Sequence, residues 1–362
     1  MLWTGPGLLG GITFGDWFAL LRDNYFAVDS AYWWRAAVIT MWSMRNSYDR
    51  WREEASRDEN IRDVSVEPPL FILGIWRSGT THLQNLFALD PRFATPNWFQ
   101  VSYPHTFLRS ERKFSRVQGF FVPRERIQDK MRFGFELPGE DEFALCTLTQ
   151  RSAMLSWVFP QRSEHYDRYL TMRRVPQEEV DEWKAALVWF VKKLTWKYGK
   201  PLVLKSPPHT ARIGLLLDLF PDARFVHIYR NPYSVFQSAS HTHRELRKYV
   251  TLQHSIADIE EQTIRQYKEV FDAFFEEKGL IPAGRYHEVR FEELECDPVS
   301  QLRSVYSALG LPDVGQVEPS VRRYMSALAG YKKNPYQEIP PETKARIVRE
   351  CRRCFEEWNY PT

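Results

Sequence analysis

The clearest hydrophobic pattern in the chain is a short apolar run at residues 70–75, which directly follows two prolines. An apolar run of this length behind chain-breaking residues is typical of a strand buried on both faces, as in a parallel sheet. Leucine and phenylalanine side chains then recur at helical spacing between residues 83 and 89. The pattern therefore predicts a strand, a glycine-containing loop and a helix within residues 70–89.

The same alternation returns in the second half of the chain. Short apolar runs predict two further strands, at 202–204 and 224–229, and residues 286–290 are expected to form another strand. Helical periodicity predicts helices at 213–220 and 255–278. Alternating strands and helices favour a parallel sheet joined by right-handed crossovers. The expected fold class is α/β, with a P-loop-like parallel sheet flanked by helices.

Two segments depart from this alternation. Residues 1–65 have helical periodicity and predict a helical N-terminal segment packed on the core. Residues 90–200 contain no second clear strand and predict a long helical insertion, and insertions of this length usually hold binding loops or a lid. The expected organisation is the N-terminal segment at 1–65 and one α/β domain at 66–362, with the insertion inside it.

Charge and composition narrow the class of protein. The 49 basic and 46 acidic side chains leave a net charge of +3, which argues against a nucleic-acid-binding surface. The chain has no apolar window long enough to span a bilayer and begins without the basic segment of a signal peptide. We expect a cytoplasmic protein, with peripheral membrane contact through the N-terminal helices as an alternative.

The loop after the first predicted strand has the spacing of a phosphate-binding loop. Gly74 and Gly79 are separated by four residues, and the predicted helix begins directly behind them. Backbone N–H groups and the dipole at a helix N-terminus favour anions. A nucleotide-hydrolysing P-loop continues with lysine, but here Thr80 follows and the cation is Arg77. The loop therefore suits a phosphate that carries one transferable anionic group better than a β,γ-phosphate pair with magnesium.

Two motifs resemble those of the sulfotransferase family. The 5′-phosphosulfate loop of that family is similar to a run of five residues here, Arg77, Ser78, Gly79, Thr80 and Thr81. The 3′-phosphate motif of the family is similar to Arg230 at a predicted strand end, followed by Asn-Pro and then by Ser238. Both motifs occur in family order. The resemblance implies 3′-phosphoadenosine 5′-phosphosulfate (PAPS) as co-substrate, bound by these residues, and a reaction without a metal.

Further segments extend the resemblance to roughly residues 66–360. Residues 290–294 resemble a strand-to-helix junction that lies beside the adenine in the family. A late basic loop of related members folds over the co-substrate, and its counterpart here implies further contacts from Tyr331, Lys332 and Asn334. The resemblance is closest to bacterial members with a helical N-terminus and a Pro-x-Glu-Asp-Glu stretch, here residues 138–142.

Sulfuryl transfer needs an anchored donor, stabilised charge on the bridging oxygen and a deprotonated acceptor hydroxyl. The resemblance assigns Lys205, at the end of a predicted strand, to the leaving-group or transferring oxygens. The usual bases of the family have no counterpart, because the histidine position is Pro207 and the loop that holds a glutamate in other members contains none, at residues 98–100.

The base is therefore expected in the acidic cluster at residues 140–142. Neighbouring carboxylates in a cleft can act as general bases near neutral pH. We choose Glu140 as the base, with Glu142 and His105 in reserve. The alternative role of the cluster is to complement the dipole of a helix that begins there.

The acceptor and two other functions are left as alternatives. The many aromatic residues of the chain favour a hydroxyl or amine on a hydrophobic small molecule, sterol or lipid, although aromatic rings also stack on carbohydrates. A P-loop kinase or NTPase would need a phosphate-binding lysine after Gly79 and a magnesium-binding aspartate. A non-catalytic nucleotide-binding scaffold would keep the fold without the base.

Overall fold

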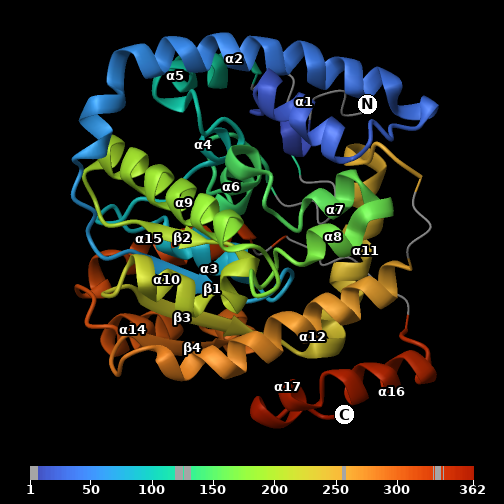
Figure 1. The fold of residues 1–362 in the computed structure, drawn as a ribbon. Coiled ribbons are helices and arrows are strands. Elements are labelled where there is room, and N and C mark those ends of the chain that lie inside the picture. Colours follow the sequence, from blue (N-terminus) through green and yellow to red (C-terminus); the bar gives the residue numbers. More distant parts are fainter. Residues whose placement is uncertain are drawn as a thin grey trace. The chain divides into compact units, whose positions relative to one another are not determined.

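The computed structural model describes residues 7–118, 125, 132–254, 258–328, 330, 336 and 338–362. The chain forms two compact units, each assembled from separate segments. Unit 1 contains residues 1–66, 96–199 and 243–258, and unit 2 contains residues 67–95, 200–242 and 259–362. Figure 1 labels the helices and strands of both units.

Unit 2 contains a four-stranded sheet in the order β2-β1-β3-β4. Every strand is parallel to its neighbours, and Phe71 of β1 lies opposite Leu204 on one side and Phe225 on the other. The strands are β1 (Leu70–Leu73), β2 (Val203–Lys205), β3 (Arg224–Tyr229) and β4 (Tyr286–Arg290). The predicted α/β class with a parallel sheet is confirmed. The first strand ends two residues early, because the backbone turns at Gly74 with φ of 138°.

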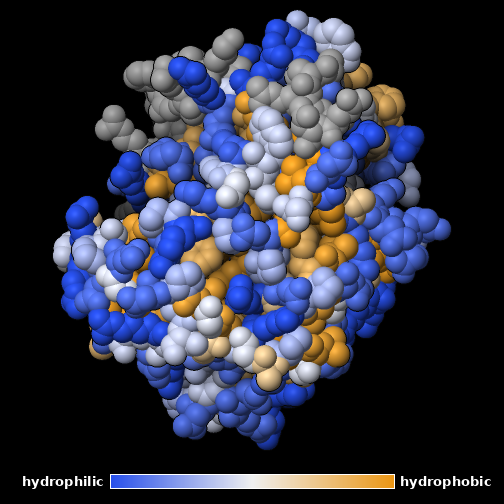
Figure 2. Space-filling model, turned by 90° about the vertical axis from the view of Figure 1, so that its left-hand side faces the viewer, coloured by the Kyte–Doolittle hydropathy of each residue, from blue (hydrophilic) through white to orange (hydrophobic). Residues whose placement is uncertain are grey.

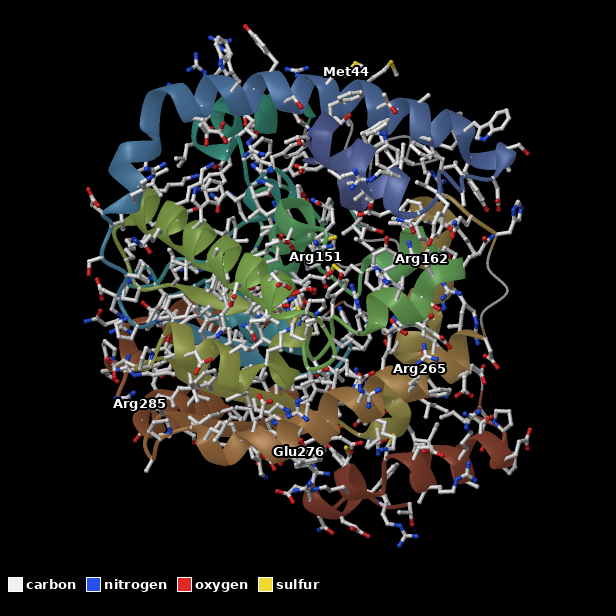
Figure 3. All side chains as sticks on the ribbon, in the orientation of Figure 1. Met44, Arg151, Arg162, Arg265, Glu276 and Arg285 are labelled. Atoms are coloured by element: carbon white, nitrogen blue, oxygen red, sulfur yellow. The ribbon has the colours of Figure 1, made fainter. Side chains whose placement is uncertain are left out.

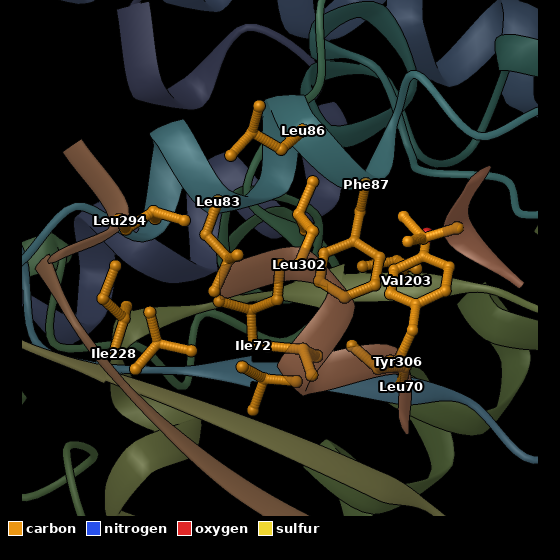
Figure 4. Packing of buried hydrophobic residues seen from close by; sticks show 14 of the residues in the cluster. Leu70, Ile72, Leu83, Leu86, Phe87, Val203, Ile228, Leu294, Leu302 and Tyr306 are labelled. Atoms are coloured by element: carbon orange, nitrogen blue, oxygen red, sulfur yellow. The ribbon is translucent and has the colours of Figure 1, made fainter. Parts of the chain in front are cut away.

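The core of unit 2 lies between the sheet and the helices on one of its faces (Figure 4). All four residues of β1 are buried, which explains its uninterrupted apolar run. Helix α3 (Thr80–Phe87) and helix α14 (Pro298–Ala308) contribute leucines and aromatic rings to this core. The Phe87 and Tyr306 rings stack with their centroids 5.6 Å apart.

The other helices of this part of the chain follow the strands. They are α10 (Ile213–Leu219), α11 (Pro232–Val250), α12 (Ile259–Glu277), α13 (Phe291–Cys296), α15 (Glu318–Leu328), α16 (Pro341–Glu350) and α17 (Arg352–Glu357). Of these, α11 continues into unit 1 from residue 243 onward. Short 3-10 turns are η4 (Pro207–Ala211), η5 (Lys278–Leu280) and η6 (Val314–Gln316). The pair of prolines after β2 thus opens a 3-10 turn before α10 begins.

Unit 1 is helical in its described residues. Its helices are α1 (Phe14–Asp23), α2 (Trp33–Arg62), α4 (Trp98–Ser102), α5 (Phe107–Gln118), α6 (Asp141–Thr149), α7 (Leu155–Val158), α8 (Ser163–Asp167) and α9 (Gln177–Tyr198). Its 3-10 turns are η1 (Gly7–Leu9), η2 (Ser30–Tyr32) and η3 (Pro160–Arg162). The predicted helical character of the N-terminal segment is confirmed, and this segment shares a unit with residues 96–199.

A buried ion pair joins the two longest helices of unit 1. The Lys193 ammonium on α9 lies 2.6 Å from Glu53 on α2. The same ammonium donates hydrogen bonds to the backbone oxygens of Pro104 and His105 at 2.7 and 2.9 Å. Charges are stable in a protein interior when they are paired and hydrogen-bonded in this way.

Two properties of the described structure bear on contact with a membrane: the hydropathy of its helices and the hydropathy of its surface. Among the described residues, no helix is both long and apolar enough to cross a membrane. On the face drawn in Figure 2, hydrophilic residues cover most of the surface and hydrophobic residues appear in patches between them.

Candidate active site

The candidate phosphate-binding residues of unit 2 gather at one edge of the sheet. Parallel strands end at the same edge, and open α/β sheets bind ligands just outside it. The loop 74–79 follows β1, Lys205 is the last residue of β2, and Arg230 follows β3. The fold therefore brings together the residues that the two sequence motifs had singled out.

Both glycines of the loop are required by its geometry. Gly79 has φ of 105°, and a Cβ atom there would lie 2.3 Å from the Cδ2 atom of Phe291. Gly74 has φ of 138°, and a Cβ atom there would lie 2.5 Å from the backbone oxygen of Ile228. Only glycine combines these backbone angles with such close approach.

Internal hydrogen bonds fix the shape of the loop. Ser78 Oγ donates to the backbone oxygen of Ile75 at 2.7 Å. The Gly74 N–H donates to Thr210 Oγ1 in η4, also at 2.7 Å. These bonds hold the loop in front of the α3 N-terminus, where the helix dipole favours an anion. Ser78 and Thr80 are buried by this arrangement.

Lys205 lies beside the first turn of α3. Its ammonium donates to Thr81 Oγ1 at 3.4 Å, and the side chain is 1% exposed. A buried cation at this place can stabilise negative charge on an oxygen bound at the helix N-terminus. The structure thus places Lys205 with the predicted 5′ loop, within the same unit.

The predicted 5′ loop and 3′ motif are in direct contact. Arg77 Nε donates to Ser238 Oγ on α11 at 2.9 Å. Arg230 Nη1 donates to the backbone oxygen of Arg77 at 3.2 Å, and its guanidinium lies 4.4 Å from the centre of the Phe291 ring. Two guanidinium groups and a hydroxyl group thereby converge, a combination that suits a phosphate.

Burial sets the electrostatics of Arg230. Desolvation lowers the pKa of Arg230 from its usual value, and the nearby Glu292 carboxylate opposes this effect. Arginine stays protonated at neutral pH despite such a shift. Glu292 is held in place by the Asn231 N–H at 3.2 Å and by the Tyr360 hydroxyl at 2.7 Å.

Sequence reasoning missed Tyr336. Its hydroxyl lies 3.0 Å from Ser238 Oγ, and its ring centre lies 5.7 Å from that of His241 on the same helix as Ser238. The residue stands outside both motifs, and only the folded chain brings it to the 3′ motif. The predicted contacts from Tyr331, Lys332 and Asn334 lie outside the described residues.

The candidate bases belong to unit 1, whereas the phosphate loop and Lys205 belong to unit 2. Glu140 occupies the N-cap position of α6, and Glu142 follows in the first turn of that helix. Both side chains are buried, and Glu142 Oε1 accepts a hydrogen bond from Ser152 Oγ at 2.7 Å. Their predicted role as the general base stays a prediction.

His105 is buried in unit 1 next to the ion pair of α2 and α9. Burial holds the pKa of His105 well below its usual value, and the cations Arg50 and Lys193 add to the effect. The ring is therefore neutral at pH 7, and its Nε2 atom has no hydrogen-bond partner among the described residues. A neutral imidazole can accept a proton, and its role as reserve base also stays a prediction.

Among the residues that the structure describes, no group of three or more histidine, cysteine, aspartate or glutamate side chains could hold a metal ion. The four cysteines are free thiols, and Cys351 and Cys354 are buried.

Comparisons with known proteins agree with these features. A model described as the sulfotransferase family matches residues 68–315. The chain is 36% identical over 337 residues to the omega-hydroxy-beta-dihydromenaquinone-9 sulfotransferase Stf3 of Mycobacterium bovis and to that of Mycobacterium tuberculosis. Each alignment covers 92% of this chain and 86% of the relative.

Solved structures share the fold. Sulfotransferase STF9 from Mycobacterium avium matches with a TM-score of 0.69 and 19% identity, over 96% of this chain and 95% of the other. Sulfotransferase STF1 from Mycobacterium tuberculosis H37Rv matches with a TM-score of 0.59 and 16% identity, over 92% of each chain. The predicted bacterial sulfotransferase fold is confirmed, and the chain belongs to the sulfotransferase family.

Proposed function

We propose that this sulfotransferase moves a sulfuryl group from PAPS to a hydroxyl group of a lipid-like acceptor. The observation that carries the proposal is the contact between Arg77 of the loop and Ser238 of α11. This contact supports two neighbouring anion subsites, one at the α3 N-terminus and one between Arg230 and Ser238. A donor with a 5′-phosphosulfate and a separate 3′-phosphate matches both.

The proposed reaction is an in-line displacement at sulfur. The acceptor oxygen forms a bond to sulfur while the bond between sulfur and the bridging oxygen of the donor breaks. The electron pair of that bond stays on the departing 5′-phosphate, where Lys205 and the α3 N-terminus would stabilise the new charge. The proton of the acceptor hydroxyl goes to the general base, for which we propose Glu140, with Glu142 and His105 as alternatives.

The name of the Stf3 relatives supports the class of acceptor. These relatives act on an omega-hydroxy-beta-dihydromenaquinone, which is a hydrophobic molecule with a hydroxyl group. At 36% identity over most of the chain, we propose an acceptor of the same class: a hydroxyl on a hydrophobic, lipid-like molecule. We also propose that the enzyme is cytoplasmic and works at the periphery of a membrane, because such an acceptor partitions into the bilayer.

The test combines donor binding with transfer. We expect 3′-phosphoadenosine 5′-phosphate to raise the melting temperature of the protein, and ATP with magnesium to have no such effect. With 35S-labelled PAPS and a bacterial lipid extract, the wild type should produce a labelled lipid and Arg77→Ala should not. Stabilisation by ATP alone would contradict the proposal in favour of a kinase or NTPase.

A matched control is available for the arginine variants. Arg353 also lies over a phenylalanine ring, 4.3 Å from the centre of Phe275, away from the sheet edge. Arg353→Ala should leave donor binding and transfer unchanged. Donor binding without transfer to any lipid or carbohydrate acceptor would favour a non-catalytic scaffold.

A further inference from the structure

Helix α2 buries several polar side chains, among them Asn46 and Glu53, together with Ile39 and Ile61, and exposes a row of mostly large apolar ones. Exposed residues recur at three- and four-residue intervals and form what we call the outer stripe: Trp34, Ala37, Met41, Met44, Tyr48 and Trp51. Figure 3 shows Met44 on the side of α2 that faces away from the other helices of unit 1. The side chains of Met41 and Trp51 are 64% and 65% exposed, so this stripe is a true surface feature.

The inward face of α2 is held by polar contacts within unit 1. Asn46 Nδ2 donates to the backbone oxygens of Gly10 and Ile12 at 2.8 and 3.0 Å. Arg35 donates to the backbone oxygen of Lys248 at 3.2 Å, and Glu53 is paired with Lys193. A rotation of α2 that buried the outer stripe would break all of these bonds. The exposed apolar side chains are therefore fixed by the fold.

The corner between α1 and α2 enlarges this apolar surface. It displays four further exposed aromatic side chains, which we call the aromatic corner: Phe18, Tyr25, Phe26 and Trp33. Tyr25 and Phe26 both have positive φ, 56° and 54°, which is unfavourable for aromatic residues. The Phe18 and Phe26 rings lie 5.6 Å apart, and Trp33 Nε1 donates to the backbone oxygen of Val28 at 3.0 Å.

Among the described side chains, three arginines lie beside the outer stripe, and two acidic residues there are paired with arginines. Asp49 is paired with Arg45 at 3.5 Å, and Glu54 is paired with Arg50 at 2.6 Å. Arg52 lies 5.6 Å from the centre of the Tyr48 ring. Guanidinium groups next to tryptophan, tyrosine and methionine complement a layer of phosphate groups above an apolar interior.

We propose that unit 1 docks on a phospholipid membrane surface through the outer stripe and the aromatic corner. Tryptophan and tyrosine would place their rings at the membrane–water boundary with their polar atoms hydrated, and α2 would lie in the plane of the interface. Arg52, beside the Tyr48 ring, would contact lipid phosphates. The aromatic corner makes the surface wider than a single helical seam, which favours a membrane over an α2 helix of a second copy.

This inference builds on the proposed lipid-like acceptor, which would itself reside in the bilayer. The test of the docking proposal measures lipid binding and not sulfuryl transfer. The docking proposal and the proposed function can therefore fail independently. The full-length protein is floated with phosphatidylcholine vesicles and with vesicles that also contain phosphatidylglycerol. We expect binding to both, and Met41→Glu with Met44→Glu should reduce it at least tenfold, because two charges would have to enter the interface.

The control variant is Leu280→Glu, since Leu280 is an exposed apolar residue of unit 2. It should bind vesicles like the wild type, and all variants should unfold at the wild-type temperature. Arg52→Gln should bind the vesicles that contain phosphatidylglycerol about fivefold more weakly than the wild type does. Each variant should sulfate a short-chain, water-soluble alcohol at the wild-type rate.

Two results would overturn the docking proposal. One is vesicle binding that is absent or that survives the Met41→Glu, Met44→Glu pair. The other is a lipid-free dimer in analytical ultracentrifugation that this pair dissociates, which would assign the outer stripe to a second copy. If wild-type protein binds vesicles but transfers no sulfuryl group to any acceptor, the docking stands and the proposed function fails.

Discussion

The sheet edge of unit 2 and the outer surface of α2 in unit 1 are built on opposite principles. At the sheet edge, Arg77 bonds to Ser238 and Arg230 bonds to the backbone of Arg77, and a Cβ atom on Gly79 would lie only 2.3 Å from the Phe291 ring. On α2, the exposed side chains of the outer stripe share a surface without such dense contacts. Substitutions at the sheet edge should therefore act abruptly, whereas those on α2 should act in proportion to the area they remove.

The largest effect should come from Gly79→Ala. The new Cβ atom would meet the Phe291 ring, and the residue would have to keep φ of 105°. We expect the free energy of unfolding to fall by about 2–4 kcal/mol, with loss of nucleotide binding. Urea unfolding measures the first change and isothermal titration the second.

Gly310→Ala is the matched control for that variant. Gly310 also has positive φ, at 59°, but no atom lies within 4 Å of the position of a Cβ. It should cost only about 1 kcal/mol, the usual penalty for a left-handed non-glycine residue. Equal losses in the two variants would mean that steric contact with Phe291 does not matter.

Arg230→Ala should weaken nucleotide binding next most strongly. Removal of a buried guanidinium from a phosphate is expected to raise the Kd for 3′-phosphoadenosine 5′-phosphate about 100-fold. Adenosine 5′-phosphosulfate lacks the 3′-phosphate, so its affinity should change little. A similar loss for both nucleotides would place Arg230 away from the 3′-phosphate.

The sheet of unit 2 should also respond to acid, through Glu288 in the middle of β4. The pKa of Glu288 is lowered to about 2: burial would raise it, but hydrogen bonds from His227 and Tyr286 outweigh that effect. Because the folded-state pKa lies below the unfolded value of 4.5, the stabilisation is complete above pH 4.5. It should be lost as the pH falls from 4.5 towards 2, at a cost of about 2 kcal/mol.

Glu288→Gln tests this acid dependence. The variant should be less stable than the wild type at pH 7, and the two stabilities should converge as the pH approaches 2. Unfolding in urea at several pH values measures the difference. A difference that does not change between pH 6 and pH 2.5 would show that the charge of Glu288 has no part in it.

The smallest effect should come from Tyr336→Phe. Loss of one neutral hydroxyl next to Ser238 should raise the Kd for 3′-phosphoadenosine 5′-phosphate about fivefold, which is equivalent to about 1 kcal/mol of binding free energy. Tyr324→Phe is the control, because Tyr324 accepts a hydrogen bond from Asn85 on α3 at 3.1 Å instead. If both variants bind alike, Tyr336 belongs to the fold and not to the nucleotide site.

The two regions also differ in how far the sequence predicts them. The strands β3 and β4 have the predicted bounds. For β3 the signal is its mostly apolar, buried sequence, which is typical of a strand inside a parallel sheet. The loop was predictable because Gly74 and Gly79 are required by local backbone angles. The contact of Tyr336 with Ser238 was not, because 98 residues separate them and no local pattern marks the pair.

The orientation of α2 could not be read from its sequence either. Helical periodicity shows which residues share a face, and an apolar face is normally expected to pack inward. Here Asn46 and Glu53 face inward because unit 1 offers backbone oxygens and Lys193 as partners. Those partners come from segments distant in the chain, so the tertiary structure decides which face is exposed.

The order of the strands has a consequence for how the protein is made. The central strand β1 pairs Leu70 with Val203 on one side and with Arg224 on the other, so more than a third of the chain separates each partner. Such long loops must close before β1 makes either of its sheet contacts, which slows folding. A growing chain on the ribosome would expose the apolar β1 segment until its partner strands emerge. This strand is therefore the place where we expect chaperones to bind during synthesis.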